Sequence, residues 1–262
     1  MSQDERTAEM LTVLSPAKSL DYVSDVTTAK NSIPIFLSEA EQLVKRMRKY
    51  SPGEISDLMG ISTKLGQLNA DRFAEWNTNC QYARQSALAF NGDVYSGFDA
   101  TSLTERDLTS AQRRIRILSG LYGVLKPLDM IHPYRLEMGT KFETGPKRSL
   151  YEFWGSKISG SLNQELSTHR SKVLVNLASA EYFGAVDLNS IDARVVTPTF
   201  KEYRNGTYKF MSFVGKRARG TMARYIAQNK VETVAGLKKF DVDGYYYSHE
   251  QSTVDGLVFL RD

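Results

Sequence analysis

Residues 194–214 read RVVTPTFKEYRNGTYKFMSFV, and they carry the clearest secondary-structure signal in the chain. Apolar and polar residues alternate over Arg194–Phe200 and again over Thr207–Val214, as expected of strands that bury one face. Between the two runs lies Asn205-Gly206, a pair that readily adopts the positive φ angles of a tight hairpin turn. The stretch therefore predicts two antiparallel strands joined at this turn.

Short apolar runs elsewhere predict further strands. Met10–Leu14 is predominantly apolar and ends at a Ser-Pro pair, where proline cannot extend a central strand. Lys172–Leu177 has an apolar centre, and Gly244–Leu260 predicts two more strands. We expect these strands to form one mixed sheet.

Helical patterns fill most of the first half of the chain. Apolar residues recur at helical spacing over 35–49, and Ser51-Pro52-Gly53-Glu54 is typical of a capped helix start. Two short helices are predicted to meet at Met59-Gly60-Ile61-Ser62, and residues 83–90 are also helix-like. Further helices are predicted over 103–118, 150–166 and 217–229, whereas 119–148 is predicted to be irregular.

The predicted fold is therefore a mixed α/β (α+β) protein that forms one compact body. The chain has 262 residues, of which 41% are hydrophobic and 24% charged, which is enough to bury a full core. No repeat or long linker divides it. We expect a polar N-terminal extension over 1–9, followed by a single domain over 10–262 with a helical lobe near 35–90.

Composition excludes several protein classes. No run approaches the roughly 20 apolar residues that a membrane-spanning helix needs, and the polar start does not resemble a signal peptide. The single cysteine, Cys80, can form neither an internal disulfide nor a thiolate metal cluster. These features predict a cytoplasmic protein that does not interact with membranes.

Motifs of catalysis are absent from the sequence. There is no phosphate loop, dinucleotide-binding turn or Gly-x-Ser-x-Gly elbow, and the three histidines, His132, His169 and His249, have no evident catalytic partner. The best group of metal donors is His132, Tyr134 and Glu137, for which a surface histidine beside a proline is the simpler interpretation. We predict no metal site and no cofactor, and we assign no catalytic residue.

Basic residues form three clusters, although the balance of 34 Lys and Arg against 30 Asp and Glu gives a net charge of only +4. The clusters are Lys45, Arg46, Arg48 and Lys49; Arg113, Arg114 and Arg116; and Lys216, Arg217, Arg219 and Arg224. Such clusters suit the closely spaced phosphates of a duplex. In the third, Lys216–Gly220 is predicted to begin a helix, so that free amides would join the arginines around a phosphate. A solvated helix face is the alternative.

The predicted helix pair around Gly60 is a second candidate for phosphate binding. An apolar-glycine-apolar turn between two helices is typical of a helix-hairpin-helix, whose backbone amides bind phosphates without reading bases. Lys64 follows the turn, where its ammonium group can reach the same phosphate. An ordinary helical pair with a glycine turn has the same pattern, so both interpretations stay open here.

Several segments together resemble the YaaA family of bacterial peroxide-stress proteins. They are Leu14–Tyr22 (LSPAKSLDY), Phe90–Gly97 (FNGDVYSG), Leu118–Asp129 (LSGLYGVLKPLD), Pro133–Gly139 (PYRLEMG), Asn176–Tyr182 (NLASAEY) and Lys216–Gly220 (KRARG). The resemblance implies a protein that limits oxidative damage by hydrogen peroxide, acting on unincorporated iron or on DNA. It also implies a fold particular to the family, with a positively charged cleft and a DNA-binding helix-hairpin-helix, which falls here on Leu58–Asn69.

We therefore predict a protein of the peroxide response that binds duplex DNA through backbone phosphates with little sequence preference, with a monomer as the working expectation. The predicted DNA contacts are Gly60, Ser62, Lys64, Lys18, Arg135, Lys216, Arg217 and Arg219. Further residues predicted to line the cleft are Ser15, Asp93, Tyr95, Asp129 and Glu137.

Three alternatives remain. An enzyme could hold a small anionic substrate near Lys18, Asp93, Arg135 and Glu137, because mixed charges in one cleft suit that role. Polar residues in tight turns also often satisfy backbone groups and nothing more. Direct iron sequestration is the weakest hypothesis, because histidine and cysteine are scarce.

Overall fold

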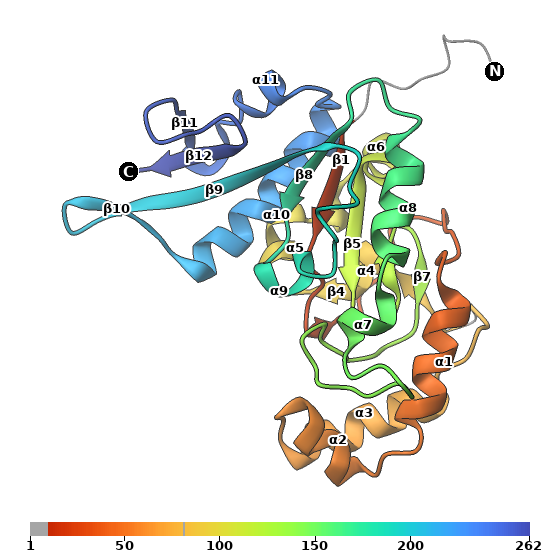
Figure 1. Cartoon of the computed structure of the whole chain (residues 1–262). Coiled ribbons are helices and arrows are strands. Elements are labelled where there is room, and N and C mark those ends of the chain that lie inside the picture. The colour runs from red at the N-terminus through yellow and green to blue at the C-terminus, as the bar shows by residue number, and fades with distance from the viewer. Residues whose placement is uncertain (1–9, 81) are drawn as a thin grey trace.

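The computed structural model describes residues 10–80 and 82–262, so the predicted extension over 1–9 lies outside the described residues (Figure 1). An eight-stranded sheet runs in the order β11-β12-β9-β8-β1-β5-β6, and β10 pairs with β9 beside it. Its strands are β1 (Leu11–Leu14), β5 (Ile115–Ser119), β6 (Gly123–Leu125), β8 (Val173–Leu177), β9 (Arg194–Arg204), β10 (Thr207–Phe210), β11 (Tyr246–Ser248) and β12 (Gly256–Arg261).

The centre of this sheet is parallel and its margins are antiparallel. Strands β12, β9, β8, β1 and β5 run parallel to their neighbours, whereas β11, β10 and β6 are antiparallel to theirs. Strand β1 is buried along its whole length, as expected of a parallel strand covered on both faces. The predicted mixed sheet and α/β class are confirmed.

Helices cover both faces of the sheet. The helices are α1 (Leu37–Met47), α2 (Pro52–Met59), α3 (Thr63–Glu75), α4 (Ser86–Ala89), α5 (Asp93–Phe98), α6 (Glu105–Arg114), α7 (Leu150–Trp154), α8 (Lys157–Leu166), α9 (Ala180–Phe183), α10 (Ser212–Asn229) and α11 (Val234–Leu237). Helices α10 and α6 pack behind the sheet as seen in Figure 1, and α8 lies in front of it. Within the described ranges, no helix combines the length and apolarity needed to cross a bilayer.

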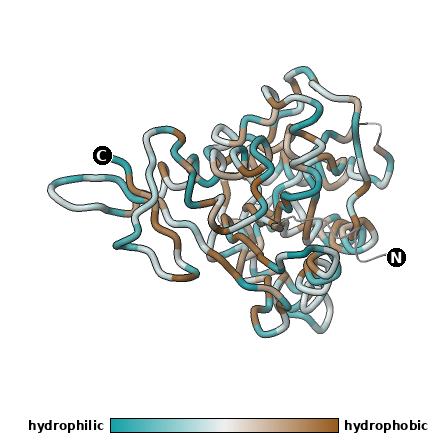
Figure 2. Tube along the Cα trace, turned by 90° about the horizontal axis from the view of Figure 1, so that it is seen from above, coloured by the Kyte–Doolittle hydropathy of each residue, from teal (hydrophilic) through white to brown (hydrophobic). Residues whose placement is uncertain are grey.

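The predicted hairpin is confirmed, but its second strand is shorter than expected. Asn205 and Gly206 have φ angles of 51° and 83°, which makes the tight turn that their sequence favours. Strand β10 ends at Phe210, because the chain already enters α10 at Ser212. The hairpin tip projects from the body and is largely hydrophilic or neutral, whereas hydrophobic segments gather inside (Figure 2).

Helices α5 and α10 cross with their backbones in contact, at two glycines. A β-carbon built on Gly220 would lie 1.7 Å from the carbonyl oxygen of Val94, and one built on Gly97 would lie 2.1 Å from that of Arg217. Only glycine fits at such an approach. The crossing fixes Val94 of α5 beside Gly220 of α10 and Gly97 of α5 beside Arg217 of α10.

Helices α1, α2 and α3 form the lower part of the molecule in Figure 1. The capping box at Ser51 and Glu54 starts α2 as predicted, and α2 and α3 are joined through Gly60. The predicted helix over 83–90 is wrong in part. Its residues form β3 (Arg84–Gln85), the short α4 and β4 (Phe90–Asn91), and these strands pair with β7 (Met130–Ile131) and β2 (Ser19–Leu20), respectively.

Two other predicted helices end earlier than expected. The helix over 103–118 stops at Arg114, because Ile115–Ser119 joins the sheet as β5, with every residue buried. The helix over 150–166 is interrupted at Gly155, whose φ of 47° lies in the left-handed region. The stretch over 119–148, predicted to be irregular, also contributes two short strands, β6 and β7.

Candidate functional site

A cavity of about 500 Å³ opens where the neighbouring strands β1 and β8 end. Among the strands of this sheet, the one that follows β1 along the chain is β5, which lies on one side of the β1–β8 pair. The strand that follows β8 is β9, which lies on the other side. The two connections leave in opposite directions, which creates a crevice at the carboxyl ends of the two strands. In open α/β sheets, this crevice is where ligands bind.

Hydroxyl groups hold the walls of this cavity, which we call the switch-point cavity, in place. The amide of Ser179 donates to Oγ of Ser15 at 2.8 Å, and Oγ of Ser15 lies 3.3 Å from Oγ of Ser179. The phenol of Tyr95 donates to the carbonyl oxygen of Ser15 at 3.1 Å. Burial raises the pKa of Tyr95 well above its usual value, so the phenol stays a donor.

Helix α10 also lines the cavity, and two of the predicted DNA contacts, Lys216 and Arg219, lie on it. Lys216 is exposed and Arg219 is partly buried, one turn further along the helix. Burial lowers the pKa of the Arg219 guanidinium, and no carboxylate offsets this effect. Within 10–80 and 82–262, neither side chain has a hydrogen-bond or ion-pair partner. Both cations therefore remain available to an external anion.

Asp93 faces the same cavity from the first turn of α5. Its carboxylate also has no hydrogen-bond or ion-pair partner in the described part of the chain. Glu181, from α9, is engaged, because its Oε1 accepts from the amide of Gly139 at 3.0 Å. The cavity thus combines an available carboxylate with available cations.

Lys18, Glu137 and Arg135 form an ion network next to the switch-point cavity. Oε1 of Glu137 lies 3.3 Å from Nζ of Lys18 and 2.9 Å from Nη2 of Arg135. The other carboxylate oxygen of Glu137 is buried and has no hydrogen-bond partner among the described residues. Tyr182 lies beside this ion network and also lines the switch-point cavity. Burial, followed by the charges of Glu181 and Glu137, raises the pKa of Tyr182. Lys18 and Arg135 therefore share one negative charge.

The structure places Asp129 away from these residues. Asp129 lines a different cavity, where it accepts from Oγ of Ser32 at 2.6 Å and from the amide of Lys126 at 2.7 Å. Burial raises the pKa of its carboxyl group. Its role in the structure is to accept these hydrogen bonds and so stabilise the turn between β6 and β7.

The start of α3 is open to solvent. Gly60 has a φ of 60°, and its amide donates to the carbonyl oxygen of Asp57 at 3.3 Å. The side chain of Ser62 caps α3 by accepting from the amide of Leu65. The amides of Thr63 and Lys64 precede the first intrahelical bond, and both residues are exposed. These amides and the Lys64 ammonium group face water together.

Two details of the predicted basic clusters are wrong. Lys216–Gly220 does not begin a helix, because α10 starts at Ser212 and the amides of Lys216–Gly220 therefore lie inside the helix. Arg114 and Arg116 are buried rather than on a basic surface, and Arg116 pairs with Glu165. Arg217 is 60% exposed and lies 3.8 Å from a carboxylate oxygen of Asp243.

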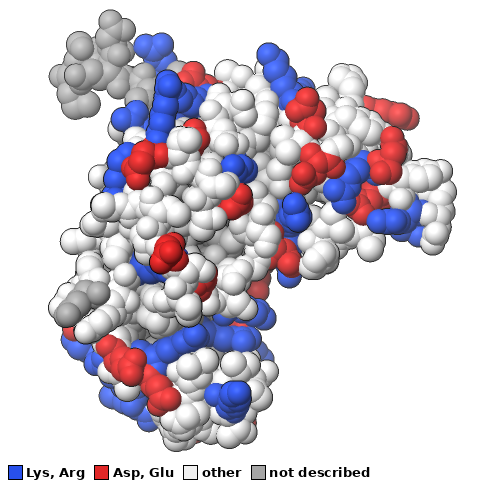
Figure 3. All heavy atoms as spheres, turned by 180° about the vertical axis from the view of Figure 1, so that it is seen from behind, with Lys and Arg blue, Asp and Glu red and all other residues white. Residues whose placement is uncertain are grey.

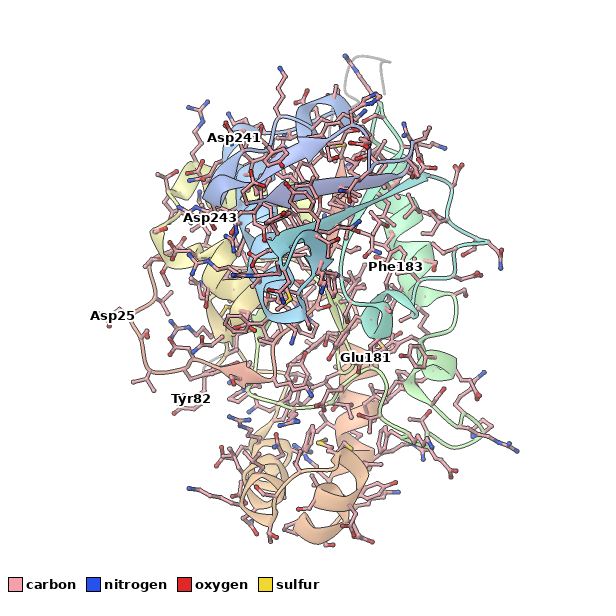
Figure 4. The ribbon with its side chains drawn as sticks, turned by 90° about the vertical axis from the view of Figure 1, so that its left-hand side faces the viewer. Asp25, Tyr82, Glu181, Phe183, Asp241 and Asp243 are labelled. Atoms are coloured by element: carbon pink, nitrogen blue, oxygen red, sulfur yellow. The ribbon has the colours of Figure 1, made fainter. Side chains whose placement is uncertain are left out.

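Several residues of the switch-point cavity were not among the predicted site residues. Ser179, Glu181 and Tyr182 follow the buried strand β8, and Asn91-Gly92 precedes α5. Their sequence signal is a polar segment directly after an apolar strand, which is where parallel sheets bind ligands. Figure 4 shows Glu181 between the level of Asp243 above and the α2 and α3 helices below.

Charges are mixed over the surface. Figure 3 shows Lys and Arg side chains along the boundary between the lower helical part and the rest of the body, with Asp and Glu side chains among them. The outline of the same view is hollowed between the projecting hairpin and the lower helices. The basic character is therefore local, in keeping with a net charge of only +4.

Comparison with known proteins places the chain in a family. It matches the family described as "Peroxide stress protein YaaA" over residues 10–251. It is 51% identical to a UPF0246 protein of Aliivibrio fischeri over 255 residues, which cover 97% of this chain and 98% of that protein. It is 52% identical to UPF0246 proteins of Alteromonas mediterranea and Pseudoalteromonas translucida, again over 97% of this chain and 98% and 99% of theirs. The chain therefore belongs to the YaaA family of peroxide stress proteins.

Proposed function

We propose that this protein binds duplex DNA through its backbone phosphates, with little sequence preference, and thereby limits damage by iron and hydrogen peroxide. The observation that carries the proposal is that solvent-facing cations without acidic partners in the described chain occur on two separate elements. Lys64 lies with free amides at the start of α3, and Lys216 lies on α10. Contacts spread over separate elements suit the repeating charge of a duplex.

The residues involved favour phosphates over base edges. Helix-start amides and lysine ammonium groups bind phosphate oxygens without carrying sequence information. Arg217 adds an exposed guanidinium on α10, whose planar fork can hold two phosphate oxygens. Lys18 is 66% exposed, so it can join by exchanging Glu137 for a phosphate, since ion pairs near the surface are weak. Arg135 would bind a phosphate beside its ion pair with Glu137.

The predicted contacts set the expected salt dependence. The six cations proposed to contact phosphates are Lys18, Lys64, Arg135, Lys216, Arg217 and Arg219. If all six engage, the logarithm of the binding constant should fall with that of salt at a slope of about −5, which is a loss of about 10³-fold between roughly 50 and 200 mM. Fluorescence anisotropy with a labelled random duplex measures both quantities.

Variants of single cations test the surface. Arg217→Ala and Lys64→Ala should each weaken binding to unrelated duplexes by similar factors and reduce the slope by about 0.9. Lys239→Ala is the matched control, because Lys239 is exposed near α11, at the opposite end from α2 and α3. Absence of binding at the lower salt, or slopes that none of these variants changes, would exclude the proposed surface.

The protective role has its own test. Supercoiled plasmid exposed to ferrous iron and hydrogen peroxide should be nicked more slowly when the protein coats it. Arg217→Ala should protect less than Lys239→Ala at equal concentration. Equal protection by both variants would show that the effect does not depend on DNA binding at α10.

A further inference from the structure

We infer that the switch-point cavity is a binding site for a phosphorylated small molecule, whose phosphate pairs with Arg219 and Lys216 and whose hydroxyl group donates to Asp93. The cavity volume of about 500 Å³ lies within the range of small-molecule sites, roughly 300–1,000 Å³. A cavity of this size encloses one small molecule, whereas a duplex can only lie across its opening. This ligand is therefore distinct from a duplex, although Lys216 and Arg219 also belong to the surface proposed to bind DNA.

Arg219 gives the strongest indication of a ligand. Its guanidinium is partly removed from water and has no acceptor within the described residues, and burial lowers its pKa. A cation that is partly removed from water and has no acceptor loses hydration that nothing replaces, so such groups are normally paired. The α5–α10 crossing at Gly97 and Gly220 holds the helix backbone rigidly, which keeps Arg219 at the cavity. An anion in the cavity would supply the missing partner.

The pairing of Arg219 with Lys216 favours a phosphate monoester over a carboxylate. The two residues are three positions apart on α10 and line the same wall. An arginine fork binds two oxygens of one anion, and a lysine ammonium group adds a second positive charge. Two positive charges match the dianion of a phosphate monoester better than the single charge of a carboxylate.

Asp93 specifies the rest of the ligand. It lines the cavity from α5 and has no donor among the described residues, so a bare anion would be repelled by it. A ligand with hydroxyl groups beside its phosphate would supply a donor to this carboxylate. Ser15 and Ser179 add hydroxyl groups at the strand ends. The combination predicts a sugar phosphate or a nucleotide.

Titration calorimetry without DNA tests the inference independently of the proposed function. The probes are ribose 5-phosphate, ribose and inorganic phosphate. We expect ribose 5-phosphate to bind more tightly than inorganic phosphate, and ribose alone not to bind. Arg219→Gln should weaken binding of ribose 5-phosphate by about 10- to 100-fold, because a charge-assisted, two-pronged contact is lost. Lys216→Ala tests the same phosphate contact by its effect on ribose 5-phosphate binding. Because Lys216 is exposed, this substitution should not affect folding.

Two comparisons make the result decisive. Asp93→Asn should reduce the preference for ribose 5-phosphate over inorganic phosphate, whereas Lys239→Ala should change neither affinity. Absence of ribose 5-phosphate binding, or binding that both α10 variants leave unchanged, would overturn the inference. A preference for duplexes with 5′-phosphate over 5′-hydroxyl ends, lost in Arg219→Gln, would also overturn it by assigning the cavity to DNA ends.

Discussion

The contact between α5 and α10 predicts that Gly220→Ala destabilises the protein far more than an alanine substitution in another helix. The added β-carbon would lie 1.7 Å from the carbonyl oxygen of Val94, whereas a normal carbon–oxygen contact is about 3.3 Å. The helices must therefore separate by roughly 1.6 Å or distort. Overpacking of this kind costs about 1–3 kcal/mol and occasionally more, and alanine returns only about 0.5–1 kcal/mol through helix propensity.

We expect a net loss of about 2 kcal/mol in the free energy of unfolding, near the upper end of this balance, which corresponds to a fall of roughly 4–8 °C in Tm for a protein of this size. Gly160→Ala is the matched control, because Gly160 lies in the middle of α8 and a β-carbon there meets nothing within 4 Å. That variant should gain about 0.5–1 kcal/mol. Thermal and urea unfolding followed by circular dichroism measure both changes.

The same substitution should also affect the switch-point cavity. Arg219 is the neighbour of Gly220 on α10, and Asp93 is the neighbour of Val94 on α5, so separating the helices moves the two sides of the proposed phosphate site apart. Binding of ribose 5-phosphate should therefore weaken in Gly220→Ala and stay unchanged in Gly160→Ala. If Gly220→Ala were as stable as the wild type, the close approach of the two backbones would be refuted.

Two further predictions concern charge. Hydrogen bonds from Ser24 and Val23 lower the pKa of Asp21 to about 2, so its ionised form stabilises the fold above pH 4 and that contribution disappears as the pH falls towards 2. Asp21→Asn should therefore lower the unfolding free energy at pH 7 by less than about 1 kcal/mol, since the site is near the surface. In urea titrations this difference from the wild type should vanish near pH 2, and a difference that persisted there would contradict the prediction. Glu137→Gln removes the carboxylate that Lys18 and Arg135 share, so DNA affinity at low salt should rise by roughly 3- to 10-fold in the anisotropy assay. An unchanged affinity would show that neither cation meets DNA.

Local signals in the sequence predicted those parts of the fold that local interactions determine. Asn205-Gly206 specified its turn because few other pairs accept two positive φ angles, and Ser51 with Glu54 specified the start of α2 through reciprocal capping bonds. The predicted helix over 103–118 failed for the opposite reason. In Ile115–Ser119 (IRILS) the apolar residues stand at 115, 117 and 118, a run too short to distinguish a buried helix from a buried strand, and only its pairing with β1 selects the strand.

The candidate site shows the same division. Lys18, Asp93, Lys216 and Arg219 were predicted to lie in one cleft, and all of them line the switch-point cavity. Asp129 was predicted to join them but lies in another cavity. The residues around it in the sequence do not indicate on which side of β5 the chain runs, so its position could not be predicted. Arg219 is partly buried without a partner among the described residues because of the α5–α10 crossing, which joins segments more than a hundred residues apart.

The central position of β1 also constrains how the chain is made. Leu11–Leu14 pairs with β5 and β8, so this apolar strand has neither neighbour when it leaves the ribosome. At about 5–20 residues per second, roughly 10–30 s separate the synthesis of β1 from that of β8. Throughout that interval the edge of β1 that pairs with β8 is open to pairing with other chains. We therefore expect chaperones to shield nascent chains until residue 177 has emerged. Mature molecules should refold without chaperones only in dilute solution.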